Sequence, residues 1–219
     1  MLKYDNYLII FYFLHRTYYH ETSNSEGEIM NSASNIETPL QSIFWQRQHS
    51  LIKQILLVLG GALLLAFASQ LSIPLKPVPL TFQSATVVLI GMAYGPRYGT
   101  YAILTYLMMG ACGLPVLADF SFGISKFFGP TAGYLIGFIP AAWMSGYLAQ
   151  KGWARNAFTS FIAACVGVSI IFTLGVTVLS QFVGFHAAIE LGVMPFMLSE
   201  SIKLIAVSVL IPTLWKKRS

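Results

Sequence analysis

Residues 156–189 read NAFTSFIAACVGVSIIFTLGVTVLSQFVGFHAAI and contain no Asp, Glu, Lys or Arg. A helix crosses the hydrocarbon core of a membrane with roughly 20 apolar residues, so this run is long enough to span it. Residues 98–118 and 127–150 form two further runs without a charged side chain. These runs predict an all-α integral membrane protein.

The composition of the chain points to the same class. Of the 219 residues, 56% are hydrophobic and 10% are charged, whereas an average soluble domain has about 25% charged residues. Five of the eight acidic residues lie within residues 1–49, and only Asp119, Glu190 and Glu200 follow. The two cysteines lie in apolar runs without the spacing of metal ligands, so they predict neither a metal site nor a disulfide.

Proline and glycine divide the second part of the chain into six predicted helices. These are residues 51–72, 80–94, 97–112, 130–150, 156–184 and 195–215. One break falls at Gly95-Pro96, and residues 113–129 form the longest connection. We therefore expect residues 50–219 to fold as one six-helix membrane domain.

Residues 1–49 differ from this domain in composition. They hold a short apolar stretch, Tyr7–Leu14, which is too brief to span a membrane, and then a segment rich in Ser, Asn and Glu. The basic start, apolar core and small-residue exit of a signal peptide do not occur in sequence. We interpret residues 1–49 as a flexible cytoplasmic extension. In the alternative interpretation, Met30 is the true start and residues 1–29 are a translation artefact.

The net charge is +5, yet the basic residues stand singly between apolar runs. A nucleic-acid partner would need them gathered along one face, so the expected surroundings of the chain are membrane lipid and not nucleic acid. Lys and Arg favour the cytoplasmic loops of membrane proteins, which predicts that both termini are cytoplasmic. The loops at 73–79, 113–129 and 184–195 then lie on the outer face, with Lys76 and Lys126 as its basic residues.

Small residues recur at every fourth position along the predicted helix 130–150. They are Gly129, Gly133, Gly137, Ala141, Ser145 and Ala149. Such a stripe lets another helix approach closely, and we expect packing inside the molecule there. Ala62 and Ala66 form a shorter stripe in the first helix, for which internal packing and an external partner surface both stay open.

The last predicted helix holds an acid–base pair, Glu200 and Lys203. The uncharged residues after it, 204–215, extend only about 18 Å at about 1.5 Å per residue, whereas the hydrocarbon core is about 30 Å thick. If Lys216 marks the inner surface, the helix must begin near residue 196 in order to cross. Glu200 and Lys203 then lie inside the membrane, and because they are three residues apart they share one helical face.

A charge inside the membrane costs on the order of 2.5–3.5 kcal/mol, so such a residue usually faces a cavity or a partner. We predict a polar ligand pocket open to the outside, in which Lys203 meets a carboxylate and Glu200 accepts N–H donors. In the alternative, the two side chains neutralise each other structurally, or Glu200 reaches the outer interface.

Motifs of enzyme chemistry are absent from the sequence. It contains neither GxxxxGK[ST] nor HExxH, so it predicts neither ATP binding by a P-loop nor that metal site. No serine has a candidate base to activate it, so we predict no catalytic residue. An intramembrane enzyme stays an unsupported alternative.

Five motifs follow one another between residues 73 and 138. They are IPLKPVPLTFQ at 73–83, YGPRYG at 94–99, YLMMG at 106–110, GLPV at 113–116 and GPTAGYLIGF at 129–138. In this order they resemble the BioY family, the biotin-specific substrate-binding (S) components of energy-coupling-factor (ECF) transporters. The resemblance covers about residues 50–215.

The resemblance implies a six-helix ECF S-component fold that captures biotin from outside and carries it across the bacterial cytoplasmic membrane. It implies no cofactor, and it leaves ATP hydrolysis to two ATPase subunits that act through a transmembrane coupling protein. The family's Ala-x-x-x-Ala docking motif matches Ala62 and Ala66. Two alternatives stay open: a self-sufficient biotin permease, and an intramembrane enzyme or assembly protein that shares the fold.

The family's last helix usually reads Pro-Phe-Leu-Pro-Gly-Asp-x-x-Lys, in which the Asp and Lys bind biotin. Residues 195–203 here read PFMLSESIK, so the Lys matches while a Glu, one methylene longer, replaces the Asp and the Pro-Gly is lost. The biotin-binding residues that the resemblance implies are Glu200 and Lys203 first, and then Ser121, Asp119, Gln83 and Tyr134.

Three of these residues have a structural alternative. In it, Gln83 only ties the Pro-rich loop to the helices, Tyr134 is a packing residue, and Asp119 is a solvated loop charge. Ser121 falls near a position that the family often fills with Asn.

Overall fold

The computed structural model describes residues 51–216. The predicted N-terminal extension, residues 1–49, lies outside the described residues. The main helices are α3 (Leu51–Gln70), α4 (Gln83–Ala111), α5 (Ala132–Gln150), α6 (Ala157–Val183), α7 (Phe185–Gly192) and α8 (Met197–Lys216). Short 3-10 turns connect them: η1 (Ala118–Phe120), η2 (Ile124–Phe128), η3 (Trp153–Arg155) and η4 (Met194–Phe196).

Helix α4 consists of two arms that run in opposite directions. Gly95 has φ 80° and ψ 173°, which breaks the helical path just before Pro96. A positive φ of this kind suits glycine, because glycine has no Cβ. The Nε2 atom of Gln83 lies 2.5 Å from the Oη atom of Tyr106, whereas an unbroken helix would separate these residues by about 35 Å. The separate helices predicted at 80–94 and 97–112 are therefore the two arms of α4.

The stripe of small residues on α5 packs inside the molecule, as predicted. A Cβ atom added to Gly137 would lie 3.1 Å from the Cα atom of Ile171, so α5 and α6 touch almost through their backbones. Ala141, Ser145 and Ala149 are fully buried. Close backbone contact of this kind fixes where the helices cross, because larger side chains would separate them.

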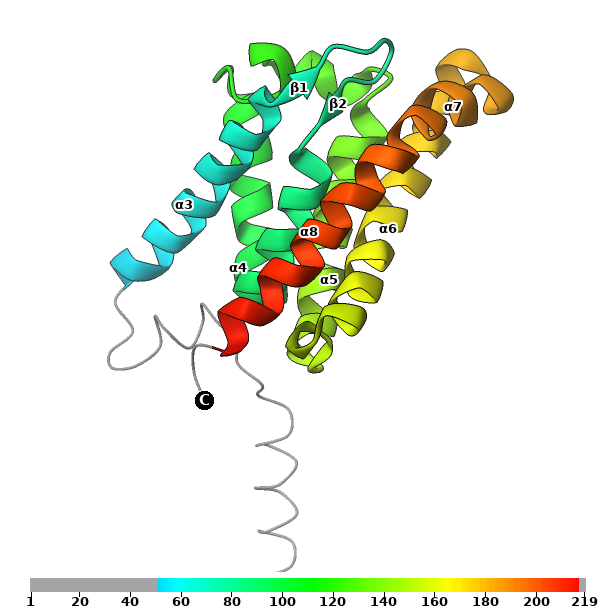
Figure 1. The fold of residues 1–219 in the computed structure, drawn as a ribbon. Helices are drawn as coiled ribbons and strands as arrows, with labels where there is room; N and C mark the ends of the chain where they lie inside the picture. The colour runs from blue at the N-terminus through cyan, green and yellow to red at the C-terminus, as the bar shows by residue number, and fades with distance from the viewer. Residues whose placement is uncertain (1–50, 217–219) are drawn as a thin grey trace, which may run out of the picture. The chain divides into compact units, whose positions relative to one another are not determined.

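One end of the helices carries the connecting segments. Figure 1 shows the short antiparallel ladder of β1 (Ser72–Ile73) and β2 (Leu80–Thr81) at this end together with α7, while α3 begins and α8 ends at the opposite end. Residues 73–79, 113–129 and 184–195, which were predicted to share one face, all lie at this end. The ladder itself was not predicted.

The segment 184–195 is not the loop that the sequence suggested. Gly184, with φ 83°, ends α6, and the chain then forms α7 and the turn η4. Pro195, at which the last helix was predicted to begin, lies within η4, and α8 begins at Met197. This end of the molecule is therefore more helical than predicted.

Three stretches of the described residues are long and apolar enough to cross a membrane: α3, α6 and the stretch Phe185–Leu214, which includes α7 and α8. The outward side of α3 carries large exposed apolar side chains, including Leu51, Ile55 and Phe67. Such a surface suits contact with lipid. The chain is thus a helical protein with the features of a multi-pass membrane protein.

Candidate ligand-binding site

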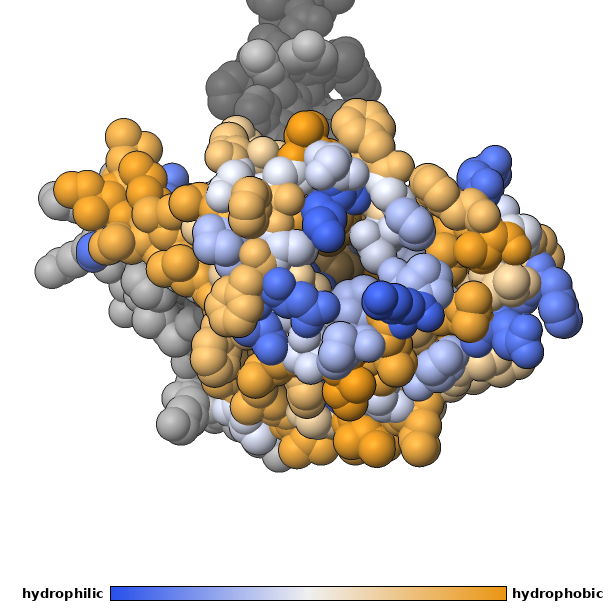
Figure 2. All heavy atoms as spheres, turned by 90° about the horizontal axis from the view of Figure 1, so that it is seen from above, coloured by the Kyte–Doolittle hydropathy of each residue, from blue (hydrophilic) through white to orange (hydrophobic). Residues whose placement is uncertain are grey.

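A cavity of about 620 Å³ lies at the end that carries the β1–β2 loop. Its walls come from that loop, the start of α4, the connection between α4 and α5, and from α5, α6, η4 and α8. Figure 2 shows a hollow in this face, surrounded by hydrophilic residues, with hydrophobic residues further out. The volume falls within the usual range of about 300–1,000 Å³ for small-molecule pockets.

Glu200 forms one side of this cavity, where Ser84 of α4 and Lys203 of its own helix hold it. Its two carboxylate oxygens each accept the Ser84 hydroxyl at 2.8 Å, and the Lys203 ammonium donates to Oε1. Lys203 also donates to the carbonyl oxygen of Thr81 at 2.7 Å. Glu200 and Lys203 are each only 6% exposed, so a charge that would be costly alone is compensated by its partner and by hydrogen bonds.

The two members of the pair differ in their access to the cavity. Glu200 is among the lining residues, whereas Lys203 is not. The Lys203 ammonium is occupied by Glu200 and Thr81 and lies 5.6 Å from the centre of the Phe82 ring. Glu200 is therefore the member that can touch a ligand in this conformation, and Lys203 acts on the cavity through it.

Gln83 lines the cavity and also ties the α4 arms to the ladder. It donates from Nε2 to Tyr106, its Oε1 accepts the Thr81 hydroxyl at 3.0 Å, and its backbone N–H donates back to that hydroxyl at 3.2 Å. Both ends of the side-chain amide are thus in use. The structural role considered for Gln83 is present, alongside its position on the cavity wall.

Tyr134 likewise lines the cavity and holds two elements together. Its hydroxyl donates to the carbonyl oxygen of Gly192 at 3.0 Å, which joins α5 to the end of α7. Its ring meets Phe172 edge to face, with ring centres 5.9 Å apart. Phe138, Phe172 and Phe196 continue this apolar wall.

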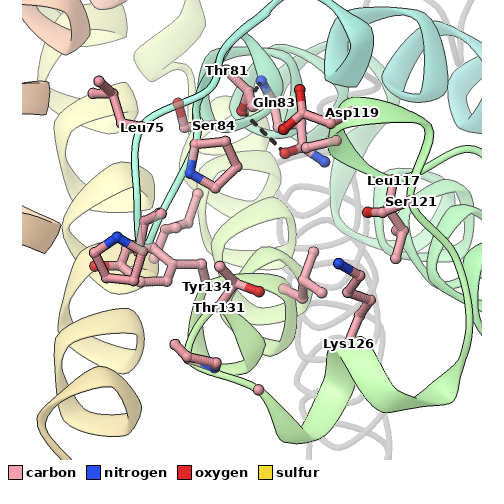
Figure 3. A pocket seen from close by; sticks show the side chains of 18 of the residues that line it. Leu75, Thr81, Gln83, Ser84, Leu117, Asp119, Ser121, Lys126, Thr131 and Tyr134 are labelled. Atoms are coloured by element: carbon pink, nitrogen blue, oxygen red, sulfur yellow. Dashed lines mark hydrogen bonds between the residues drawn. The ribbon is translucent and has the colours of Figure 1, made fainter. Parts of the chain in front are cut away.

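Asp119 and Ser121 lie in the connection between α4 and α5 and line the mouth of the cavity. Figure 3 shows them with Lys126, which comes from η2 on the same connection. Asp119 adopts φ 58°, in the left-handed region, and its Oδ1 atom accepts the Ser72 hydroxyl at 2.5 Å. This contact joins the connection to β1.

Several lining residues were missed by the sequence analysis, among them Ser84, Lys126 and Thr131. Ser84 directly follows the family-like motif that ends at Gln83, but nothing in its spacing distinguishes it from an ordinary serine in a helix. Its role depends on a carboxylate 116 positions further along the chain. Only the fold brings these two side chains together.

The small-residue stripe on α3 faces the other helices. Ala62 is fully buried and Ala66 is partly buried against the same core. A Cβ atom on the neighbouring Gly61 would lie 2.8 Å from that of Ala102, so this side of α3 packs on α4. Docking of a partner at Ala62 and Ala66 stays a prediction.

No group of three or more His, Cys, Asp or Glu side chains that could hold a metal ion occurs within residues 51–216. The polar groups of the cavity are instead hydroxyls, the Gln83 amide, the carboxylates of Glu200 and Asp119, and the ammonium groups of Lys76 and Lys126. This arrangement can bind an organic molecule that carries N–H donors at one end and an apolar body.

Comparison with known proteins gives consistent matches. The model of the BioY family matches residues 36–219. A biotin transporter BioY of Thermotoga maritima is 43% identical, over 67% of this chain and 86% of its own length. A probable biotin transporter BioY of Pyrococcus horikoshii is 38% identical, with coverage of 69% and 89%. One of Rickettsia prowazekii is 31% identical, with coverage of 83% and 93%.

A solved structure also resembles this chain. It is the crystal structure of the S-component for biotin from an ECF-type ABC transporter, which matches with a TM-score of 0.69 at 24% identity and covers 77% of this chain and 95% of its own. At that identity the match shows that the two chains share a fold.

Proposed function

The chain belongs to the BioY family, and on that premise we propose that it binds biotin in the cavity beside Glu200 and takes part in its uptake across a membrane. The observation that carries the proposal is the buried Glu200 carboxylate, held by Ser84 and Lys203 at the wall of a cavity of about 620 Å³. The family consists of transporters, so the chain is a transport protein and not an enzyme.

The chemistry of biotin fits this cavity. The molecule has a ureido group with two N–H donors and one carbonyl, an apolar bicycle, and a carboxylate at the end of an alkyl chain. Glu200 accepts the ureido N–H groups, because an ionised carboxylate is the stronger acceptor for them. Phe138, Phe172 and Phe196 cover the apolar bicycle.

The other predicted residues take supporting roles in this proposal. Lys203 pairs with Glu200 and fixes its position, and Gln83 and Tyr134 hold the walls through their hydrogen bonds. Asp119 and Ser121 line the entrance. A buried pair of this kind is sensitive to the loss of either partner, since the remaining charge is left uncompensated.

The proposal extends to the assembly. We propose six membrane crossings with both termini in the cytoplasm of a bacterium, so that the cavity opens to the outside of the inner membrane. Support comes from the Lys and Arg bias of the loops and from the gathering of three connections at one end. The partners are a transmembrane coupling protein and two ATPase subunits, with Ala62 and Ala66 as the docking positions.

Biotin binding by the purified full-length protein in detergent tests the proposal. We expect saturable binding of one biotin per chain at micromolar concentrations or below, measured by calorimetry. A protein that is monodisperse but does not bind biotin at these concentrations would overturn the proposal. Uptake into vesicles with and without co-expressed ATPases then separates a coupled transporter from a self-sufficient permease.

A further inference from the structure

Two lysines that line the cavity form no ion pair, and the acidic residue near them on its wall, Asp119, accepts the Ser72 hydroxyl instead. Lys76 and Lys126 both line the cavity, whereas Lys203 does not. Glu200 and Lys203 form the sole ion pair within the described part of the chain, so neither Lys76 nor Lys126 has an acidic partner there. A carboxylate that enters the cavity therefore meets one of these two ammonium groups.

The position of Glu200 decides where the carboxylate of a ligand can lie. Two carboxylates repel each other, so the acid end of the ligand is expected to point away from Glu200. The Ser84 hydroxyl donates to both oxygens of Glu200, so Ser84 lies on the Glu200 side of the cavity. Figure 3 shows Ser84 and Lys126 on different sides of the pocket.

The surroundings of the two lysines distinguish them. The neighbours of Lys76 on the cavity wall are prolines and apolar residues, among them Pro77 and Val78. Lys126 shares the wall with hydroxyl groups, and Figure 3 shows Ser121 on the same side of the pocket. A carboxylate accepts several hydrogen bonds, so a cation accompanied by hydroxyl donors binds it better than a cation among apolar groups.

Three hydroxyls are available for this purpose. Those of Ser121, Ser125 and Thr131 line the cavity, and among residues 51–216 none of the three donates to or accepts from another group. The connection between α4 and α5 carries all three, and its backbone is held by hydrogen bonds in which the Gly123 N–H donates to the Gly110 carbonyl at 2.8 Å and the Lys126 N–H donates to the Gly123 carbonyl at 3.2 Å. The three hydroxyls are thus presented from this connection and keep their hydrogen-bonding capacity.

We infer that Lys126, with the hydroxyls of Ser121, Ser125 and Thr131, binds the carboxylate of the ligand and makes the site selective for an acid over its neutral analogue. This inference rests on the proposed binding of biotin. It assigns the two ends of the ligand to two sides of the cavity: the ureido group to Glu200, and the carboxylate to η2 near the mouth. Lys203 is a positioning residue for Glu200 in this arrangement.

The experiment compares biotin with biotinamide, which replaces the carboxylate by a neutral amide, using the purified full-length protein and calorimetry. The unaltered protein should bind biotin about 10-fold more tightly than the amide, because a charge-assisted contact is lost with the amide. In Lys126→Gln, biotin should bind about 10-fold more weakly while the affinity for the amide stays the same, so the preference disappears. Unchanged amide binding also shows that the variant is folded.

Two further variants control the result. Lys76→Gln removes a lysine from the same cavity and should keep the preference for the acid, while Lys126→Arg should retain most of it. A preference that survives in Lys126→Gln, or that is lost in Lys76→Gln instead, would overturn the assignment of Lys126. Failure of the unaltered protein to bind biotin at all is a different outcome, which would overturn the proposed function itself.

Discussion

The turn of α4 at Gly95 and the cavity at the other end of the same two arms are packed in opposite ways. At the turn, a Cβ atom on Gly146 would lie 2.6 Å from the Pro96 nitrogen and 2.7 Å from the Gly91 oxygen, so backbone meets backbone. At the other end the helices enclose a cavity of about 620 Å³ that side chains line. Tight packing thus fixes the helices at one end, and side-chain chemistry determines binding at the other.

The largest effect on stability is expected at the turn of α4, where the packing is tightest. Gly146→Leu would push a side chain into backbone atoms of α4, which cannot move aside as a flexible side chain could. We expect a destabilisation of about 3 kcal/mol or more and little folded protein, because overpacking forces the helices apart. The measurement is the yield of monodisperse protein in size-exclusion chromatography, together with Tm.

Gly60→Leu is the matched control for that variant. Gly60 is an exposed residue of α3, and no atom lies within 4 Å of a Cβ added to it. The yield and Tm of Gly60→Leu should stay close to those of the unaltered protein. A normal yield of Gly146→Leu would show that the α4 turn tolerates expansion, and the contrast between the two ends would be lost.

The next effect concerns the buried pair at the cavity. Lys203→Ala leaves Glu200 in the interior without its cation, which costs on the order of 3–5 kcal/mol for a buried pair. The carboxylate should then lose its position at the cavity wall, and we expect biotin binding to weaken by at least about 100-fold. Calorimetry on protein that is still inserted and monodisperse measures this loss, and an unchanged affinity would refute the role of the pair.

A smaller effect is expected from the hydroxyl that orients the same carboxylate. Ser84→Ala removes the donor shared by the two oxygens of Glu200 while the ion pair remains. We expect biotin to bind about 5- to 10-fold more weakly, which corresponds to the net free energy of about one ordinary hydrogen bond. Ser201→Ala is the control, because that exposed hydroxyl bonds only the Met197 carbonyl of its own helix.

The smallest effect on biotin affinity is expected from a substitution at the mouth of the cavity. Ser72→Ala removes the hydroxyl that donates to Asp119, a contact between exposed side chains that water can replace. The affinity for biotin should change by about twofold or less, since a solvated hydrogen bond contributes little net free energy. A loss as large as that of Ser84→Ala would mean that the mouth is held more rigidly than its exposure indicates.

Much of the helical framework could be predicted from the sequence. Apolar runs bounded by Pro and Gly located α3, α5, α6 and α8 to within a few residues, and Gly95-Pro96 located the reversal of α4. These signals are local, because the length of an apolar run and the backbone preferences of Gly and Pro do not depend on the rest of the fold. The small residues at every fourth position of α5 likewise predicted that another helix packs closely against it.

The segment around α7 shows where such local signals fail. Residues 184–195 were expected to form a loop between the predicted helices 156–184 and 195–215, yet residues 185–192 form a helix. The contact of Tyr134 with Gly192 holds the end of that helix against α5. A short segment of this kind has little preference of its own, so its neighbours in space select its conformation.

The sequence by itself determined that Glu200 and Lys203 share one helical face, because they are three residues apart, and helix length predicted that this face lies inside the membrane. Only the tertiary structure decided that Glu200 faces the cavity while Lys203 turns to Thr81, and that Ser84 completes the site. The reason is physical. A hydrogen bond depends on which groups lie within about 3 Å in space, and those groups come from helices far apart in the chain.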